Sequence, residues 1–143
     1  MSQINLDTSL GYLLKQASST LHGEMDAVLR PHGMTITEYS CLELLAQRPG
    51  MSNSELARGA FVSRQSMNVL LQAMERDGFV SRPEQAAAGR VLPTSLTTLG
   101  RERLAIASAA VKGVENRMKS GLDSLQQDEL RRLLAGCITS LTG

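Results

Sequence analysis

The chain has 143 residues, of which 42% are hydrophobic and 20% charged, a balance that fits one domain with an apolar core and excludes a disordered chain. Aromatic residues make up only 3%, so leucine, alanine, valine and methionine must fill the core, which favours helices over a β-sandwich. The formal net charge of +1 neither indicates nor excludes a nucleic-acid ligand, because such binding depends on where the positive groups lie.

The chain carries few signs of targeting or covalent cross-linking. It has no apolar run long enough to cross a bilayer, and residues 1–7 lack the basic start and apolar stretch of a signal peptide. The two cysteines, Cys41 and Cys137, lie far apart without C-x-x-C spacing, which argues against a disulfide framework or a zinc site. His22 and His32 have no neighbouring third ligand, so no metal site is expected. We therefore expect a cytoplasmic protein without a membrane segment.

The first third of the chain predicts two helices. Between residues 6 and about 30, apolar side chains recur at spacings of three and four, the pattern of a long amphipathic helix. Pro31 ends this helix. Thr37 is the expected cap of a second helix, which runs from about Glu38 to Gln47.

The middle of the chain predicts two shorter helices. Ser52, with Glu55 three residues later, forms a capping box for the first of them. Ser63 is the expected cap of the second, and Gly78 stands where a helix C-terminal glycine belongs. The apolar residues of this second helix form its inner face: Met67, Leu70, Leu71 and Met74.

A hairpin and two further helices are expected to complete the chain. The segments 79–82 and 90–96 are predicted strands joined by a polar loop, and Pro93 places the second strand at an edge. Thr97 is the expected cap of the next long helix, and the last helix runs from about Gln127 to Leu141. The predicted fold is therefore mostly α with a small β-hairpin wing, a winged helix-turn-helix core flanked by N- and C-terminal helices.

A winged helix-turn-helix reads DNA with the N-terminal, outward face of its second helix, which must carry short polar or basic side chains to enter the major groove. Arginine can pair with guanine, glutamine and asparagine with adenine, and serine with bases or phosphate. The helix capped by Ser63 offers such a set: Ser63, Arg64, Gln65, Ser66, Asn68 and Gln72. From this helix alone, an ordinary solvated face is the alternative.

Three other residues are candidates for contacts with the DNA backbone. Ser52 and Asn53, together with the amides at the start of their helix, could donate to a phosphate, and capping alone is the alternative role. Arg82, at the end of the first wing strand, could contact a phosphate or pair instead with Glu84 or Asp77.

Several segments follow one another in a recognisable order: Ser54–Ala57, Phe61–Arg64, Leu71–Val80 with Arg82, then Arg90 and Ser95–Gly100. This ordered series resembles the helix-turn-helix, the wing and the start of the dimerisation helix in the MarR family of transcriptional regulators. The resemblance covers essentially the whole chain, including its length and the flanking helices.

The resemblance implies a homodimer whose N- and C-terminal helices interlock and place two DNA-binding lobes over a pseudo-palindromic operator. It also implies that Arg90 inserts in or beside the minor groove, where a guanidinium fits the narrow, negative groove of A/T-rich DNA. A surface arginine that stabilises the hairpin is the alternative. Ala88 stands where members commonly carry an aspartate, which, together with Pro93, leaves the geometry of the wing open.

We therefore expect one domain, residues 1–143, with dimerisation helices at about 6–30 and 98–141 and a winged helix-turn-helix lobe at about 37–97. The expected function is sequence-specific binding of double-stranded DNA by a homodimeric, ligand-responsive repressor, without a cofactor and without enzymatic activity. By the resemblance, a small-molecule effector would lie between the dimerisation helices and the DNA-binding lobe. Two alternatives stay open: a helical dimerisation or adaptor protein that has lost DNA binding, and a redox sensor based on Cys41 or Cys137.

Overall fold

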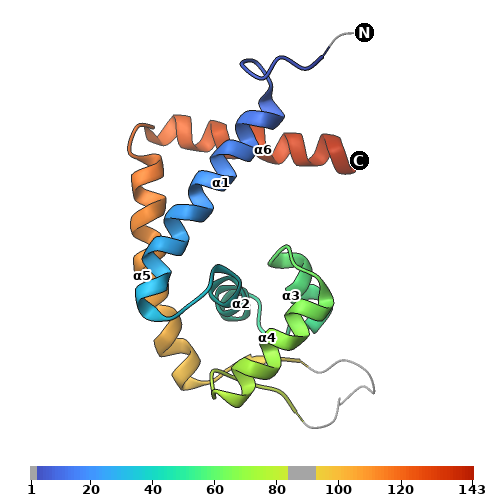
Figure 1. Cartoon of the computed structure of the whole chain (residues 1–143), viewed down its shortest axis with the longest axis vertical. Helices are drawn as coiled ribbons and strands as arrows, with labels where there is room; N and C mark the ends of the chain where they lie inside the picture. Colours follow the sequence, from blue (N-terminus) through green and yellow to red (C-terminus); the bar gives the residue numbers. More distant parts are fainter. Residues whose placement is uncertain (1–2, 84–92) are drawn as a thin grey trace. The chain divides into compact units, whose positions relative to one another are not determined.

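The computed structural model of the chain describes residues 3–83 and 93–143 (Figure 1). Arg90, Ala88 and Glu84, singled out above, lie outside these described residues. Contacts divide the chain into two compact units, one ending at Val111 and the other formed by Lys112–Gly143, and each is considered by itself.

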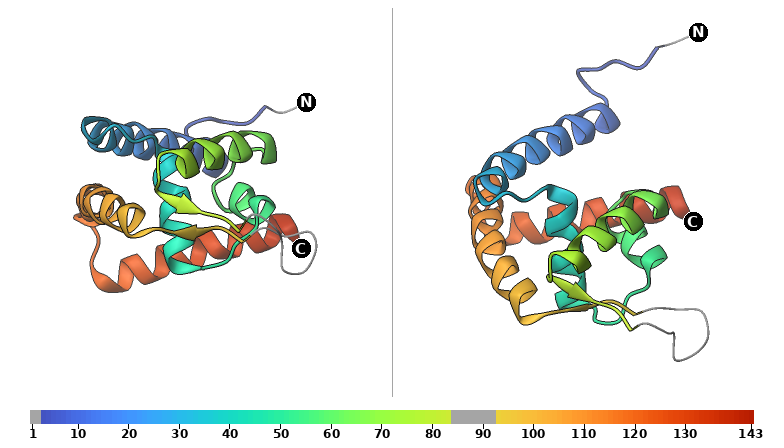
Figure 2. Two further views of the ribbon diagram at one scale, coloured as in Figure 1. Left: turned by 90° about the horizontal axis from the view of Figure 1, so that it is seen from below. Right: turned by 60° about the horizontal axis from the view of Figure 1, so that its bottom comes forward.

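Helices dominate the described residues, and one short hairpin interrupts them, as the sequence predicted. The elements are α1 (Leu10–Leu29), the 3-10 turn η1 (Arg30–His32), α2 (Ile36–Gln47), α3 (Asn53–Gly59), α4 (Arg64–Arg76), β1 (Val80–Ser81), β2 (Ser95–Leu96), α5 (Thr98–Lys119) and α6 (Ser124–Thr142). The strands are antiparallel, with Val80 opposite Leu96 and Ser81 opposite Ser95, and Figure 2 shows them side by side in yellow. The predicted fold class is confirmed.

Three of the predicted helix starts differ from the structure. The first helix begins at Leu10 and not at residue 6, and its cap is Ser9. The cap of α2 is Thr35 and not Thr37, because Thr35 has the extended backbone of a cap and its hydroxyl accepts a hydrogen bond from the Glu38 amide at 3.1 Å. The last helix begins at Ser124, three residues before the predicted start. Its cap is Asp123, whose carboxylate accepts a hydrogen bond from the Gln126 amide at 2.8 Å.

The core of the first unit lies between α2, α3, α4 and the hairpin. Helix α4 packs against α3 and β1, and α2 packs against α3 and β2 (Figure 1). Each element contributes apolar side chains that are removed from water, which is the main favourable term in folding. The largest of these fully buried apolar side chains are Leu29, Leu42, Leu56, Met67, Leu71 and Met74. This core fixes α4 by one face and leaves the opposite face to solvent.

The start of α5 is tied to the end of α4 by a close backbone approach. The Thr97 hydroxyl donates to the Gly78 carbonyl oxygen at 2.6 Å and accepts from the Gly100 amide at 3.0 Å, which confirms the predicted cap. The Phe79 carbonyl oxygen accepts from the Thr97 amide at 3.2 Å. A Cβ at position 100 would lie 2.1 Å from that same carbonyl oxygen, so the junction requires glycine there.

Helices α1 and α6 each carry a stripe of leucines that faces solvent in the single chain. Exposed apolar surface of this extent is unfavourable in water and is typical of interaction surfaces. The exposed leucines are Leu10, Leu13 and Leu14 in α1, and Leu125, Leu130, Leu133, Leu134 and Leu141 in α6. Among the described helices, none is both long and apolar enough to span a membrane.

The junction at Gly100 yields a stability prediction. Gly100→Ala should lower the free energy of unfolding by about 2 kcal/mol or more, because the new methyl group overlaps a backbone oxygen that already holds Thr97. Gly113→Ala is the matched control in the same helix, since a Cβ there meets no atom within 4 Å, and it should be neutral or stabilising by up to about 1 kcal/mol. Urea unfolding followed by circular dichroism measures both. Equal stabilities would show that the junction tolerates a side chain.

Candidate nucleic-acid interface

The N-terminus of α3 is held by the predicted capping box. The Ser52 amide donates to Glu55 Oε1 at 3.0 Å, and the Glu55 amide donates to Ser52 Oγ at 3.2 Å. Hydrogen bonds from Ser52 hold the pKa of the Glu55 carboxyl below its ordinary value, and the bond from the Ser52 backbone amide has the largest effect. Both side chains therefore have a structural role at this helix end, and the capping prediction is confirmed.

The N-terminus of α4 is capped by Ser63, as predicted. Its hydroxyl oxygen accepts from the Ser66 amide at 3.0 Å, and the hydroxyl also donates to Ser66 Oγ at 3.0 Å. The helix therefore begins at Arg64, with the free amides of its first turn and the positive end of its dipole at the surface. Such a helix end favours a phosphate group.

Helix α4 has two contrasting faces. Met67, Leu71 and Met74 are buried in the core of the first unit. The cap and first turn of the helix, and Gln72 on its outward side, are polar and exposed. We call this set the reading face: Ser63, Arg64, Gln65, Ser66 and Gln72. Donors and acceptors of this kind, on a helix held to the core by its other side, can meet the base edges of a major groove.

Two of the candidate DNA-binding residues instead contact each other. Asn53 Nδ2 donates to Asn68 Oδ1 at 3.3 Å, and this bond joins the start of α3 to the second turn of α4. Both side chains are half-buried, and the buried Asn53 Oδ1 has no partner among the described residues. These two asparagines thus link α3 to α4, and their contacts with DNA stay a prediction.

Arg82 is also engaged within the chain. Its Nη2 donates to Glu75 Oε1 at 3.3 Å, and only 14% of the side chain is exposed. Its described partner is thus Glu75, on α4, and not Asp77, which the sequence offered as one alternative to a phosphate contact, while Glu84, the other, lies outside the described residues. The Arg82 Nε is buried without a partner among the described residues, so this guanidinium retains donor capacity.

The sequence did not single out Phe61 for a role in binding. This residue lies in the turn between α3 and α4, where its side chain is 93% exposed and its φ is 60°. Val69, on the outward side of α4, is another exposed apolar residue next to the reading face. The signal in the sequence is that a phenylalanine occupies the position after a helix end where glycine usually stands.

The first unit also contains a cavity of about 280 Å³, which we call the Arg103 pocket. Arg103 Nε donates to Glu38 Oε1 at 3.0 Å, and Arg103 Nη2 donates to the Gly33 carbonyl oxygen at 3.0 Å. Its guanidinium also lies over the Phe79 ring, 4.7 Å from the centroid. The lining combines this cation with mostly apolar side chains: His32, Met34, Phe79, Leu99, Glu102, Arg103 and Ile106.

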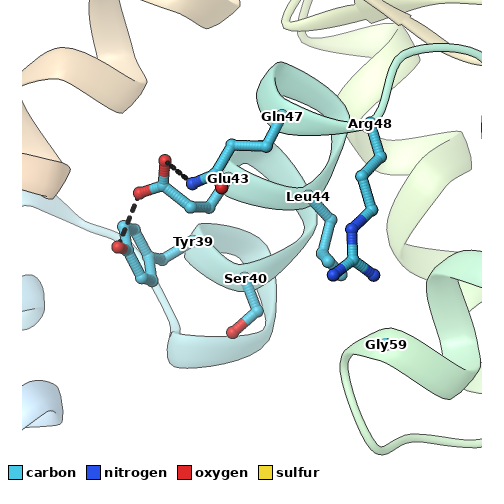
Figure 3. Close-up of a pocket in the computed structure, with 7 residues that line it drawn as sticks. All are labelled: Tyr39, Ser40, Glu43, Leu44, Gln47, Arg48 and Gly59. Carbon is cyan, nitrogen blue, oxygen red and sulfur yellow. Dashed lines mark hydrogen bonds between the residues drawn. The ribbon is translucent and has the colours of Figure 1, made fainter. Parts of the chain in front are cut away.

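A second cavity, of about 220 Å³, lies between α2 and the end of α3 (Figure 3). Figure 3 shows Tyr39 and Gln47 on either side of the Glu43 carboxylate, which accepts from the Tyr39 hydroxyl at 2.6 Å and from Gln47 Nε2 at 3.1 Å. A Cβ at Gly59 would lie 2.8 Å from Leu44 Cδ1, which shows how closely the two helices approach. The lining of this cavity contains both the Glu43 carboxylate and Arg48, just as that of the Arg103 pocket contains both Glu102 and Arg103.

The two cysteines differ in their surroundings. Cys41 lies on α2 and is buried in the core, and this burial raises the pKa of its thiol from 9.0 to about 12, with a smaller contribution from the negative charge of Glu38. Cys137 is exposed on α6. Over the described ranges, no three His, Cys, Asp or Glu side chains converge in a way that could hold a metal ion.

A helix-turn-helix with a polar reading face, followed by a hairpin, defines the winged helix-turn-helix class of DNA-binding proteins. A model of the MarR family matches residues 32–91 of the chain. The HTH-type transcriptional repressor Rv2887 of Mycobacterium tuberculosis is 42% identical over 128 residues, which span 90% of this chain and 92% of that protein. The chain belongs to the MarR family of DNA-binding transcriptional regulators.

Solved structures of relatives agree with this assignment. The crystal structure of Rv2887 with DNA has a TM-score of 0.74 and 39% sequence identity, covering 91% of this chain and 98% of that one. The same protein with salicylic acid has a TM-score of 0.74 at 41% identity, covering 91% and 96% of the two chains. The transcriptional repressor CouR, bound to a 23-mer DNA duplex, has a TM-score of 0.81 at 28% identity, covering 96% of this chain and 99% of that one.

The burial of Cys41 predicts an unreactive thiol. In a Cys137→Ser variant, Ellman's reagent should label Cys41 slowly in the folded protein, even at pH 9. With a pKa of about 12, about one thiol in a thousand is ionised at that pH, whereas half would be ionised with the ordinary pKa of 9.0. Guanidinium chloride should make the labelling fast. Rapid labelling of the folded variant at neutral pH would contradict the burial and would favour the redox-sensor alternative.

Proposed function

We propose that the chain is a ligand-responsive repressor that binds a pseudo-palindromic operator as a homodimer. The observation that carries this proposal is the reading face, which presents Arg64 and Gln65 at the exposed, dipole-positive end of α4. Two relatives with DNA in their structures, Rv2887 and CouR, support the same class of ligand. In this proposal Ser63, Arg64, Gln65, Ser66 and Gln72 read bases or contact phosphates, and occupation of the promoter blocks transcription.

The proposed partner for the exposed leucines is a second copy of the chain. Each of the two compact units has an apolar helix face in water, on α1 in the first and on α6 in the second. A two-fold dimer would cover the faces of α1 and α6 in one symmetric interface. Together the units would form one MarR-like domain per chain. Such a dimer presents two copies of α4, whose half-sites on the duplex would lie about 34–36 Å apart.

The wing completes the proposed DNA contact. By the family resemblance, Arg90 reaches the minor groove beside the bases that α4 reads. Arg82, at the base of the wing, would contact a phosphate only by leaving Glu75, so its contribution would come with the loss of that ion pair. Ser52 and Asn53 would add backbone contacts through the amides at the start of α3.

The proposed effector is an aromatic carboxylic acid in the Arg103 pocket. The pocket offers an apolar lining for a ring and a guanidinium for a carboxylate, and the relative Rv2887 has been crystallised with salicylic acid. A carboxylate bound to Arg103 would compete with Glu38 and the Gly33 carbonyl, and so would loosen the link between α5 and the start of α2. A change in that link would alter the orientation of the two reading faces and weaken DNA binding.

The reading face predicts a specific loss of DNA affinity. Arg64→Ala should weaken binding to the DNA upstream of the protein's own gene by about tenfold or more, the value of one bidentate arginine–guanine contact. Arg76→Ala removes the same charge from the last turn of α4 and should change the affinity by about twofold at most. Fluorescence anisotropy at several salt concentrations measures the affinity, and the stoichiometry should be two chains per duplex. Wild-type binding no tighter than to random DNA would favour the adaptor alternative.

The Arg103 pocket predicts how an effector acts. Salicylate should weaken DNA binding by the wild type, whereas phenol, which lacks the carboxylate, should have little effect. Arg103→Gln should reduce the response to salicylate, and Arg101→Gln, an equal change of charge at an exposed position of α5, should preserve it. The same anisotropy assay with added ligand measures each response. An equal response of both variants would exclude this pocket as the site.

A further inference from the structure

Helix α3 ends in a hydrogen-bonding pattern that normally requires glycine. The Phe61 amide donates to the Arg58 carbonyl oxygen at 3.3 Å, and the Val62 amide donates to the Ala57 carbonyl oxygen at 3.0 Å. These two bonds form a Schellman motif, whose central residue adopts a left-handed conformation. Here that residue is Phe61, with φ of 60°, and among the described residues it is the one non-glycine with positive φ.

The same motif occurs at two other helix ends of the first unit, and both use glycine. After η1, Gly33 has φ of 66°, and after α4, Gly78 has φ of 85°. The Gly78 amide donates to the Glu75 carbonyl oxygen at 3.1 Å, and the Phe79 amide to the Met74 carbonyl oxygen at 2.9 Å, the same pair of bonds as in the motif at Phe61. The chain therefore departs from glycine at one of three equivalent positions.

Phe61 is unfavourable for the free protein in two respects. A side chain with a Cβ is strained in the left-handed region, which glycine adopts without that strain. The ring is also 93% exposed, so it gains almost nothing from the core. A strained and exposed aromatic residue that contributes nothing to folding points to a role in binding.

The position of Phe61 places it beside the reading face. Val62 alone separates it from Ser63, the cap of α4, and Arg64 follows directly. A DNA duplex that meets Ser63 and Arg64 in its major groove must also pass the turn that leads into this helix end. In the major groove, thymine presents a methyl group that aromatic and aliphatic side chains contact.

We propose that Phe61 is a specificity-determining residue that packs against a thymine methyl group at the edge of the major groove. This inference rests on the proposed DNA-binding function and adds a thymine preference next to the bases that α4 reads. The energy comes from removing the exposed ring and the methyl group from water together, and so it depends little on salt.

The test replaces thymines of the operator, one at a time, with deoxyuridine, which removes only the methyl group. The probe is the upstream duplex bound in the anisotropy assay. At one position in each half-site, the wild type should lose about fourfold in affinity, the value of one buried methyl group. Phe61→Gly should bind the unmodified operator about tenfold more weakly and should show no further loss at that position.

Three further variants separate this role from folding. Phe61→Asn tolerates the left-handed conformation but lacks the ring, and it should behave as Phe61→Gly does. Phe61→Tyr keeps the ring and should keep the thymine effect. Gly50→Ala introduces the same strain at another left-handed residue, where φ is 83° and a Cβ meets no atom within 4 Å, and it should lower the melting temperature without changing the affinity.

The outcomes distinguish this proposal from the one on which it rests. If the wild type does not prefer the upstream duplex, the proposed DNA-binding function fails. If the wild type binds and responds to deoxyuridine, but Phe61→Gly and Phe61→Asn respond equally, the role of Phe61 is overturned while the function stands. Loss of self-association in these variants, with the thymine effect intact, would likewise overturn it by placing Phe61 at a contact between protein chains.

Discussion

The close backbone approach between the end of α4 and the start of α5 is the constraint on which the rest of the first unit depends. The Phe79 carbonyl oxygen lies where a Cβ of residue 100 would have to be, and Thr97 bonds to both sides of the contact. One helical turn after Gly100, Arg103 reaches Glu38, the Gly33 carbonyl and the Phe79 ring. A single glycine thus connects the DNA-binding helix, the long helix α5 and the start of α2.

The same connection explains how a small ligand could influence a distant helix face. The guanidinium of Arg103 already has a carboxylate and a carbonyl as partners, so a bound acid would have to exchange with them. Phe79, which lines the Arg103 pocket, directly follows the glycine that ends α4. A change in the pocket is therefore only a few bonds from the helix that carries the reading face.

The helix-turn-helix shows a division between residues that hold it together and residues that remain available. Asn53 and Asn68 bond to each other, Arg82 bonds to Glu75, and Ser52 bonds to Glu55. The polar groups of Arg64, Gln65 and Gln72 remain at the surface. Phe61 adds an apolar group at the edge of this surface, at the expense of backbone strain that the two equivalent glycines avoid.

Most of the fold could be predicted from local sequence patterns. The spacing of apolar residues and the caps at Ser52, Ser63 and Thr97 predicted most of the helices, because capping and helical periodicity depend on residues three or four positions apart. The prediction of Thr37 as a helix cap was wrong because Thr35 and Thr37 both carry a hydroxyl group and lie two residues apart. Only the backbone conformation distinguishes them.

The sequence by itself determined the elements, the polar face of α4 and the class of ligand that this face suits. Tertiary structure alone decided which polar residues have partners within the chain: Asn68 and Arg82 look as available in the sequence as Arg64, but each has a partner from another element. It also decided that Gly100 admits no side chain, that Cys41 is buried and that Phe61 is exposed. These properties depend on distances between residues far apart in the chain, or on the backbone angle at one residue. Neither can be predicted from a local sequence pattern.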